Sequence, residues 1–332
     1  MRYSRSVYAA AQGELERRKN TAQELAAAHR AQVTASCPEL LIIEEQIRTA
    51  ALGAAKLLTG SPSDASVLKK LERASVQAQK DRIALLKHLK LPEDYLDEQY
   101  TCPQCEDSGF ISGRLCDCHA RLLKTLACEE LSRTSPSSFC GFDNFSLNYY
   151  SNKLDPEIGL KPRTIMKKTL QECREYADGF SLLSPSMYFC GGTGLGKTHL
   201  SLAIANEVTQ RGFGVVYITT QNLMNRLEKE HFSKDSQEDT LELVLGCDLL
   251  IIDDLGTEFA TTFTNAQLYN IINTRLLETK PVIISANLTY EDIEVRYDPR
   301  LASRIMSYRY VDFIGTDVRQ QKVDRKEGDS DA

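Results

Sequence analysis

Apolar side chains in the first hundred residues recur at the spacing of an α-helix. Residues 8–33 are rich in Ala, Glu, Gln, Arg and Leu, all of which favour helix. After Pro38, a second stretch over 39–58 places five apolar residues at helical spacing: Leu40, Ile43, Ile47, Ala51 and Ala54. A third run follows a Gly-Ser-Pro-Ser turn and ends near Lys90. The pattern predicts a small helical bundle or hairpin, either with an ordinary core or as a partner-binding module.

The pattern changes at about residue 162, where short apolar runs begin to alternate with helical stretches. Such runs, separated by helices, are typical of parallel strands that are buried on both faces. We therefore expect an α/β domain with a parallel five-stranded sheet. The strands are expected at 187–191, 215–219, 249–253, 281–285 and 310–314.

Composition and charge narrow the class of protein. The 332 residues are 42% hydrophobic and 26% charged, as in ordinary soluble proteins. The net charge is −6, so charge alone predicts no nucleic-acid binding. The sequence has no apolar run of about 18 residues and no signal-peptide core at its start. We expect a cytoplasmic protein without a membrane contact, in which the ten cysteines stay reduced.

Four of these cysteines cluster after the helical region. Cys102 and Cys105 form a C-x2-C pair, and Cys116 and Cys118 form a C-x-C pair directly before His119. Reducing conditions disfavour a disulfide framework, and a redox C-x-x-C would be expected beside a βαβ pattern, which is absent here. Two close thiolate pairs joined by a short hairpin suit tetrahedral Zn²⁺. We expect structural zinc, with His119 as an alternative to Cys118 and free buried thiols as the competing interpretation.

A glycine-rich loop follows the first expected strand and precedes a helical stretch. Glycines in such a loop let backbone N–H groups surround phosphate oxygens, and the helix N-terminus adds its positive dipole end. The lysine can reach the β- and γ-phosphates, and the threonine hydroxyl can hold Mg²⁺. A ligand-free turn is the alternative. The loop matches G-x-x-x-x-G-K-[ST] and consists of Gly191, Gly192, Thr193, Gly194, Leu195, Gly196, Lys197 and Thr198.

Polar residues end two further strands. Asp253 and Asp254 end an apolar strand, where the first would support Mg²⁺ through water and the second would polarise the attacking water. Asn287 follows the next strand and could sense the γ-phosphate, although an asparagine at a strand end is often turn chemistry. Arg300 and Arg304 lie four residues apart on one helical face. Either arginine is a surface cation or a finger that reaches a neighbour's γ-phosphate.

These motifs together resemble the AAA+ ATPases. The segments GGTGLGKTHL, DLLIIDDLG and RLASRI are similar to those of DnaC and DnaI helicase loaders and of the related IstB transposition helpers, over about residues 140–325. The resemblance implies ATP and Mg²⁺ as cofactors. It assigns Lys197 and Thr198 to the Walker-A site, with Thr198 and Asp253 on magnesium. It also makes Asp253 and Asp254 the Walker-B pair and Asn287 sensor 1.

The same resemblance implies self-association into a spiral or ring. Arg304 matches the arginine finger of the loaders, and Arg300 is its less certain companion. Two departures stand out. Many AAA+ proteins have Glu at the position of Asp254, so the shorter side chain predicts slow hydrolysis. Only about 28 residues follow Arg304, which is too few for a full helical lid.

Contacts with nucleic acid and with a partner are also expected from the resemblance. In the loaders, the charged helical insertion that corresponds to 223–244 faces a central channel and contacts single-stranded DNA. Phe232 is the candidate for stacking on a base, and anchoring of the helix to the core is the alternative. Less specifically, residues 40–120 are similar to the zinc-binding amino-terminal module that joins a replicative DnaB-type hexameric helicase.

The expected organisation has five parts: a helical partner-binding module (1–100), a zinc-binding segment (101–120), a linker (121–161), an AAA+ P-loop domain (162–322) and a polar tail (323–332). The first functional hypothesis is a helicase-loading ATPase. An IstB-like helper that recruits a transposase to DNA is the second. A third is a binding module in which nucleotide acts only as a conformational switch.

Overall fold

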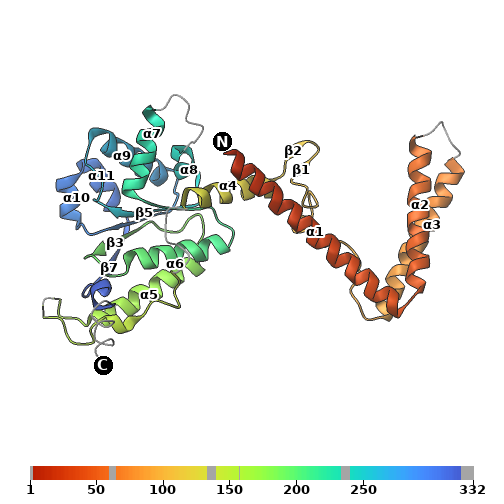
Figure 1. Cartoon of the computed structure of the whole chain (residues 1–332), viewed down its shortest axis with the longest axis horizontal. Helices are drawn as coiled ribbons and strands as arrows, with labels where there is room; N and C mark the ends of the chain where they lie inside the picture. Colours follow the sequence, from red (N-terminus) through yellow and green to blue (C-terminus); the bar gives the residue numbers. More distant parts are fainter. Residues whose placement is uncertain (1–2, 60–64, 133–139, 157, 233–239, 323–332) are drawn as a thin grey trace. The chain divides into compact units, whose positions relative to one another are not determined.

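The structure is a computed structural model that describes residues 3–59, 65–132, 140–156, 158–232 and 240–322 (Figure 1). The expected polar tail lies outside these residues. The chain forms two compact units, one of residues 12–119 and one of residues 1–11 with 120–332. None of the described helices is both long enough and apolar enough to cross a membrane.

Residues 12–119 are mainly helical, as the spacing of apolar residues predicts. Helix α1 spans Arg5–Ser36, α2 spans Glu39–Thr59 and α3 spans Ala65–His88. Helices α2 and α3 pack against each other along their length. A small core of Val33, Leu40, Leu86 and Leu96 closes the end where α1 meets α2.

A short hairpin lies between the two cysteine pairs. Strand β1 (Phe110–Ile111) pairs antiparallel with β2 (Arg114–Leu115), and α4 begins at Asp117 and ends at Ser132. Gly109 and Gly113 take positive φ angles of 77° and 78°, which glycine adopts without the strain of a side chain. The hairpin brings the second cysteine pair back beside the first.

The other unit contains a five-stranded parallel sheet with the order β4-β5-β6-β3-β7. Its strands lie within two residues of the expected ranges, because most of them are runs of buried apolar residues. Strand β7, at one edge of the sheet, instead has exposed residues at three of its five positions. The expected five-stranded parallel sheet is therefore confirmed. The strands are β3 (Met187–Gly191), β4 (Val215–Thr219), β5 (Leu249–Leu255), β6 (Val282–Ala286) and β7 (Arg309–Phe313).

Helices cover both faces of this sheet (Figure 1). Alternate residues of β3 show the two faces, since Met187 and Phe189 join one core cluster while Tyr188 and Cys190 join the other. Helices α5 (Pro162–Asp178) and α6 (Lys197–Gln210) pack on the first face. The second face is covered by α4 and by five further helices: α7 (Thr220–Phe232), α8 (Thr240–Gly246), α9 (Thr262–Leu277), α10 (Tyr290–Arg296) and α11 (Pro299–Ile305).

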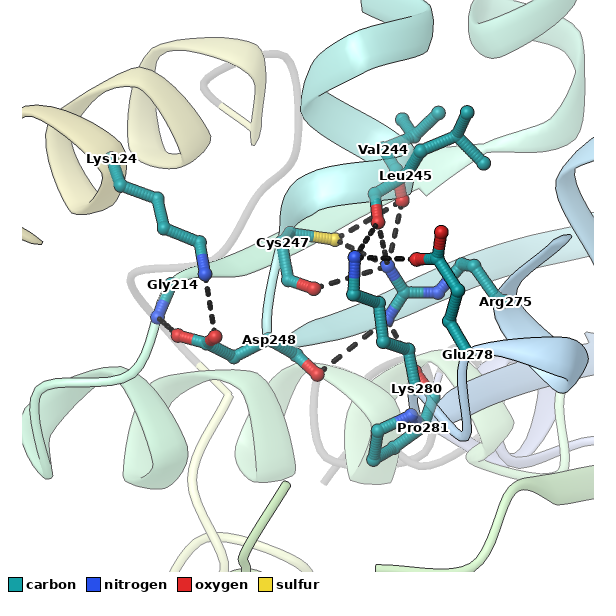
Figure 2. Close-up of polar contacts among 10 residues, drawn as sticks. All are labelled: Lys124, Gly214, Val244, Leu245, Cys247, Asp248, Arg275, Glu278, Lys280 and Pro281. Atoms are coloured by element: carbon teal, nitrogen blue, oxygen red, sulfur yellow. Dashed lines mark hydrogen bonds and ion pairs between the residues drawn. The ribbon is translucent and has the colours of Figure 1, made fainter. Parts of the chain in front are cut away.

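The expected helical insertion over 223–244 is divided between α7 and α8 in the described residues. Helix α8 is short, and its C-terminal carbonyl groups are bound by a cation rather than by a further helical turn (Figure 2). Arg275 of α9 is fully buried and donates hydrogen bonds to the carbonyl oxygens of Val244 (2.8 Å) and Cys247 (3.1 Å). It also donates to Pro281 O at 2.8 Å, beside the start of β6.

A second cation joins α4 to the same region (Figure 2). Lys124 Nζ lies 2.6 Å from Asp248 Oδ1, and the other carboxylate oxygen of Asp248 accepts the Gly214 N–H at 2.8 Å. Because a buried cation needs acceptors and helix-end carbonyls need donors, Arg275 satisfies both requirements at once. These contacts attach the middle of α4 and the C-terminal ends of α8 and α9 to the residues that precede β4, β5 and β6.

Replacing Arg275 with Met tests this arrangement. The variant removes the guanidinium donor from the carbonyl oxygens of Val244 and Cys247, so we expect the free energy of unfolding to fall by roughly 3 kcal/mol or more. Urea unfolding followed by circular dichroism measures the change. Arg121→Met, at an exposed position of α4, is the control and should stay within about 0.5 kcal/mol of wild type. Equal unfolding midpoints for the two variants would contradict the assigned role of Arg275.

Candidate functional site

The glycine-rich loop joins the end of β3 to the start of α6. Gly191 and Gly194 have φ angles of 152° and 73°. A Cβ atom at Gly191 would lie 2.1 Å from the carbonyl oxygen of Phe313, so any side chain there would collide with β7. At Gly194 the same atom would lie 1.9 Å from Asp317 Oδ1. Glycine is therefore required at both positions, and the loop keeps its N–H groups accessible to an anion.

Lys197, the first residue of α6, is only 5% exposed. Its ammonium group donates to the carbonyl oxygens of Gly191 and Gly192, each at 2.8 Å, and to Asn287 Oδ1 at 2.6 Å. Burial is the main cause that lowers the pKa of Lys197. The structure thus brings together the lysine of the loop and the asparagine that follows β6, although 90 residues separate them in sequence.

Asp253 lies toward the C-terminal end of β5, between β4 and β6, and is 1% exposed. Thr198 Oγ1 donates to Asp253 Oδ2 at 2.9 Å, which places the two expected magnesium-supporting groups in contact. The hydroxyl groups of Tyr217 and Ser285 also donate to this carboxylate. Burial, and then the charge of Asp253, raise the pKa of Tyr217 above its usual value, so the phenol stays a donor.

Sequence reasoning did not identify Tyr217 and Ser285. Both are hydroxyl-bearing residues within otherwise apolar strands, in VVYIT and VIIS. A buried hydroxyl needs a partner, and β4 and β6 are the two neighbours of β5. A polar residue inside a buried strand could therefore have indicated a buried hydrogen-bond partner. Only the strand order shows that this partner is the carboxylate of Asp253.

Asp254, next along β5, differs from Asp253 in its surroundings. It is partly exposed, it lines the pocket described below, and its φ angle is 55°, an uncommon value for a residue with a side chain. Burial and then the charge of Asp253 raise the pKa of the Asp254 carboxyl group. A raised pKa makes a carboxylate a stronger base, so the arrangement can orient and polarise a water molecule.

These residues surround a pocket of about 440 Å³. One wall holds most of the expected site: Thr193, Gly194, Leu195, Gly196, Lys197, Thr198, Asp254 and Asn287. Gly191, Gly192 and Asp253 support this wall from behind through the hydrogen bonds given above. The size is typical of small-molecule sites.

The rest of the lining includes two segments that sequence reasoning left without a functional role. Phe145, Tyr149 and Tyr150 come from the expected linker, and Arg319 and Lys322 come from the last described residues. The Tyr150 hydroxyl donates to Leu195 O at 2.8 Å, and its ring stacks on Phe145 with 5.8 Å between the centroids. The cluster of aromatic residues in FDNFSLNYY was the available signal.

Arg300 and Arg304 do not line this pocket. Both belong to α11. Arg304 Nε donates to Asn273 Oδ1 of α9 at 3.0 Å. Arg300 pairs with Asp298 at 2.9 Å and lies over the ring of Tyr269, 5.3 Å from its centroid.

Phe232 also lies apart from the pocket. It is the last residue of α7 and is 79% exposed. Its ring makes an edge contact with His231, at 5.0 Å between centroids, and His231 in turn contacts the ring of Phe263. The exposed fraction is too large for a residue that anchors the helix to the core.

The four clustered cysteines lie in the helical unit, and their sulfur atoms all fall within 4.8 Å of one another. Cys102 Sγ is 3.9 Å from Cys116 Sγ, and Cys105 Sγ is 3.4 Å from Cys118 Sγ. Such a set of four sulfur donors fits the ligand number and type of a structural zinc site. The group includes Cys118 rather than His119, whose ring is 5% exposed.

We compared the chain with families of known proteins, with curated relatives and with solved structures. A family model described as IstB-like ATP binding protein matches residues 180–312. The replicative helicase loader DnaC of Escherichia coli (strain K12) is 30% identical over 138 residues, which are 41% of this chain and 56% of that protein. The chain thus spans about half the length of this relative.

Two further matches are a phage-like protein and a solved structure. The phage-like element PBSX protein XkdC of Bacillus subtilis (strain 168) is 28% identical over 228 residues, covering 62% of this chain and 79% of that protein. A crystal structure of the DnaC helicase loader aligns with 52% of this chain and 98% of its own, with 23% identity and a TM-score of 0.43. Residues 180–312 are therefore similar to IstB-like ATP binding proteins, and residues of this chain also resemble the DnaC helicase loader.

Proposed function

We propose that this chain is an ATPase that loads a replicative, DnaB-type hexameric helicase onto single-stranded DNA. One observation carries the proposal: Lys197, Asp254 and Asn287 converge on one pocket from the ends of three neighbouring strands. The DnaC relative, itself named a replicative helicase loader, supports the choice of this function among those of AAA+ ATPases.

The pocket's residues suit binding of the phosphates of ATP. Backbone N–H groups of the loop hold the β-phosphate, and Lys197 bridges the β- and γ-phosphates. Thr198 and Asp253 are the protein groups that hold Mg²⁺, which neutralises the charge on the phosphate oxygens. Asp254 polarises the attacking water, and Asn287 orients it beside the γ-phosphate. The hydrogen bonds from Lys197 to Asn287 and from Thr198 to Asp253 keep these four side chains in position before ATP arrives.

The arginines support assembly of several copies into a spiral or ring. Neither Arg300 nor Arg304 lines the pocket of its own chain, and Arg304 is held on the surface of α11 by Asn273. We assign Arg304 to the pocket of a neighbouring copy, with Arg300 as its companion. The exposed ring of Phe232 provides a surface for stacking on a single-stranded base in the channel of such an assembly.

The cysteine cluster supports a zinc-stabilised module for binding the helicase. Four sulfur atoms from two short segments lie together beside a two-stranded hairpin of exposed residues. Such a segment has too little core of its own for stability, and bound Zn²⁺ supplies the missing folding energy. We assign Cys102, Cys105, Cys116 and Cys118 as its ligands.

An IstB-like transposition helper is the second candidate, because the matching family model is described as IstB-like ATP binding protein and the sequence motifs resemble those of IstB helpers. It would use the same ATPase residues and recruit a transposase to DNA. The two candidates differ in the partner that the chain delivers to DNA.

Helicase loading by the full chain tests the first candidate. In the presence of ATP, we expect the wild type to raise the amount of DnaB-type helicase bound to single-stranded DNA circles. Lys197→Ala should lose this activity and bind ATP roughly 10- to 100-fold more weakly, because a charged hydrogen-bond donor to phosphate is removed. Lys167→Ala, at an exposed lysine of α5, is the matched control. Wild-type binding of ATP by Lys197→Ala would defeat the assignment, and delivery of a transposase instead of the helicase would favour the second candidate.

Mixing two inactive variants tests Arg304. Arg304→Ala should bind ATP normally and lose at least tenfold in assembly-dependent hydrolysis, because the finger acts on a neighbour's phosphate. Lys197→Ala should also be inactive but still carry its finger. An equimolar mixture should recover part of the wild-type rate, since some interfaces then combine an intact loop with an intact finger. An Arg304→Ala rate equal to wild type at every protein concentration would show that the finger is elsewhere.

Metal content tests the zinc site. The purified chain should contain about one zinc ion, measured by inductively coupled plasma mass spectrometry. Cys105→Ser and Cys118→Ser should each lose most of it, because three thiolates hold Zn²⁺ less tightly than four. His119→Gln and Cys37→Ser, outside the sulfur cluster, should retain it. Retention by Cys118→Ser together with loss by His119→Gln would make His119 the fourth ligand.

A further inference from the structure

Strands β5 and β6 change register at the point where β5 carries its two acidic residues. Their pairing is regular as far as Ile252 and resumes at Leu255 on β5, whereas a single residue, Ser285, lies between the partners of these two on β6. Asp253 and Asp254 therefore lie opposite one residue. Such an insertion is a β-bulge, which is rare between parallel strands and is often found next to active sites.

The bulge changes the face of the sheet that the following side chains meet. Successive side chains of a regular strand point to opposite faces. Ile252 packs in the core of the second face, so a regular strand would point Asp254 into that apolar core. In the structure Leu255 joins that core instead, and Asp254 lines the nucleotide pocket. The bulge thereby keeps a carboxylate out of an apolar core, where an unpaired charge is costly.

The hydroxyl group of Ser285 binds both acidic residues at the bulge. It accepts the backbone N–H of Asp254 at 3.1 Å and donates to the carboxylate of Asp253. A bulge interrupts the ladder of backbone hydrogen bonds, and this hydroxyl oxygen supplies the acceptor for the displaced N–H group. Because Ser285 is fully buried, water does not compete for these bonds.

The backbone of Asp254 is held at its other polar group as well. Thr257 Oγ1 donates to Asp254 O at 2.8 Å, and Thr257 is an exposed residue of the pocket lining. The φ angle of Asp254 is 55°, outside the range of a regular strand, so its conformation depends on contacts of this kind. Water can replace the bond from exposed Thr257. The bond to buried Ser285 is therefore the more important of the two.

We infer that Ser285 is a positioning residue for ATP hydrolysis, because it holds the bulge that aims the Asp254 carboxylate at the attacking water. The inference rests on the proposed function, in which Asp254 polarises that water, and adds a residue that lies behind the pocket. A group that polarises water acts only within hydrogen-bond reach of it, and a displacement of about 1 Å can cost roughly 100-fold in rate. Loss of the Ser285 hydroxyl should therefore affect hydrolysis more than binding of ATP.

Separate measurements of ATP hydrolysis and ATP binding by the full chain test the inference. Ser285→Ala removes the acceptor of the Asp254 N–H, so we expect kcat at saturating ATP and Mg²⁺ to fall about 10- to 100-fold. The dissociation constant of a non-hydrolysable ATP analogue should change less than about threefold, because the phosphate loop is intact. Ser285→Thr keeps the hydroxyl group and should recover most of the rate. Ser181→Ala, at an exposed serine outside the pocket, is the matched control.

Tyr217→Phe separates the two bonds of Ser285. It removes a donor to Asp253 and leaves the bond between Ser285 and the Asp254 N–H. Because Asp253 is assigned to Mg²⁺, this variant should raise the Mg²⁺ concentration that gives half-maximal hydrolysis. At saturating Mg²⁺ it should lose much less rate than Ser285→Ala does. Equal losses in the two variants would mean that Ser285 acts only through Asp253, and would overturn the inference.

The same serine substitution in an Asp254→Asn chain gives a further readout. Under single-turnover conditions, Ser285→Ala should lower the rate of this chain less than about threefold, because the carboxylate that it positions is already absent. A purely structural role would lower the rate by the same factor in both chains. That result, or a loss of ATP binding by Ser285→Ala as large as its loss of rate, would contradict the inference. A wild-type chain that does not hydrolyse ATP would overturn the proposed function as well.

Discussion

A buried carboxylate determines how the candidate nucleotide site is built. Asp253 is 1% exposed, and an ionised carboxylate at such depth is stable only when donors surround it. Thr198, Tyr217 and Ser285 supply these donors from α6 and from the two strands that flank β5. The hydrogen bonds that stabilise this charge therefore also hold the phosphate-loop helix together with β4, β5 and β6. A slip of β4 or β6 by one residue would turn its hydroxyl group to the other face of the sheet and leave the charge under-satisfied.

Much of the fold could be predicted because its signals are local in sequence. Four of the five strands are short, mainly apolar runs between helical stretches, and a strand buried on both faces needs no longer-range information to be recognised. The phosphate loop was equally clear, since its glycines and Lys197 follow a strand directly. The hairpin between the cysteine pairs was also expected, from SGFISG. The helix boundaries were less accurate, and the expected insertion over 223–244 became α7 and α8 in the described residues.

The remaining features depend on contacts between distant residues. Phe145 and Arg319 line one pocket, although Phe145 precedes the first strand of the five-stranded sheet in sequence and Arg319 follows the last. No periodic pattern relates the two residues. Ser285 appeared to be one polar residue in an apolar strand until the order β5-β6 placed it beside Asp253. Arg275 resembled an ordinary basic residue near a helix end, although it is fully buried. A cation can be recognised as interior only when the carbonyl groups that solvate it are known.

Helix α9 makes two polar contacts that lie only two residues apart in sequence. Asn273 holds Arg304 of α11, and Arg275 holds the end of α8. Residues two positions apart on a helix point to different sides, so α9 contacts α11 on one side and α8 on another. A rotation of α9 about its axis would therefore move Asn273 and Arg275 together and disturb both contacts. Helix α9 therefore connects α11, which carries Arg304, to α8 at the end of the charged insertion.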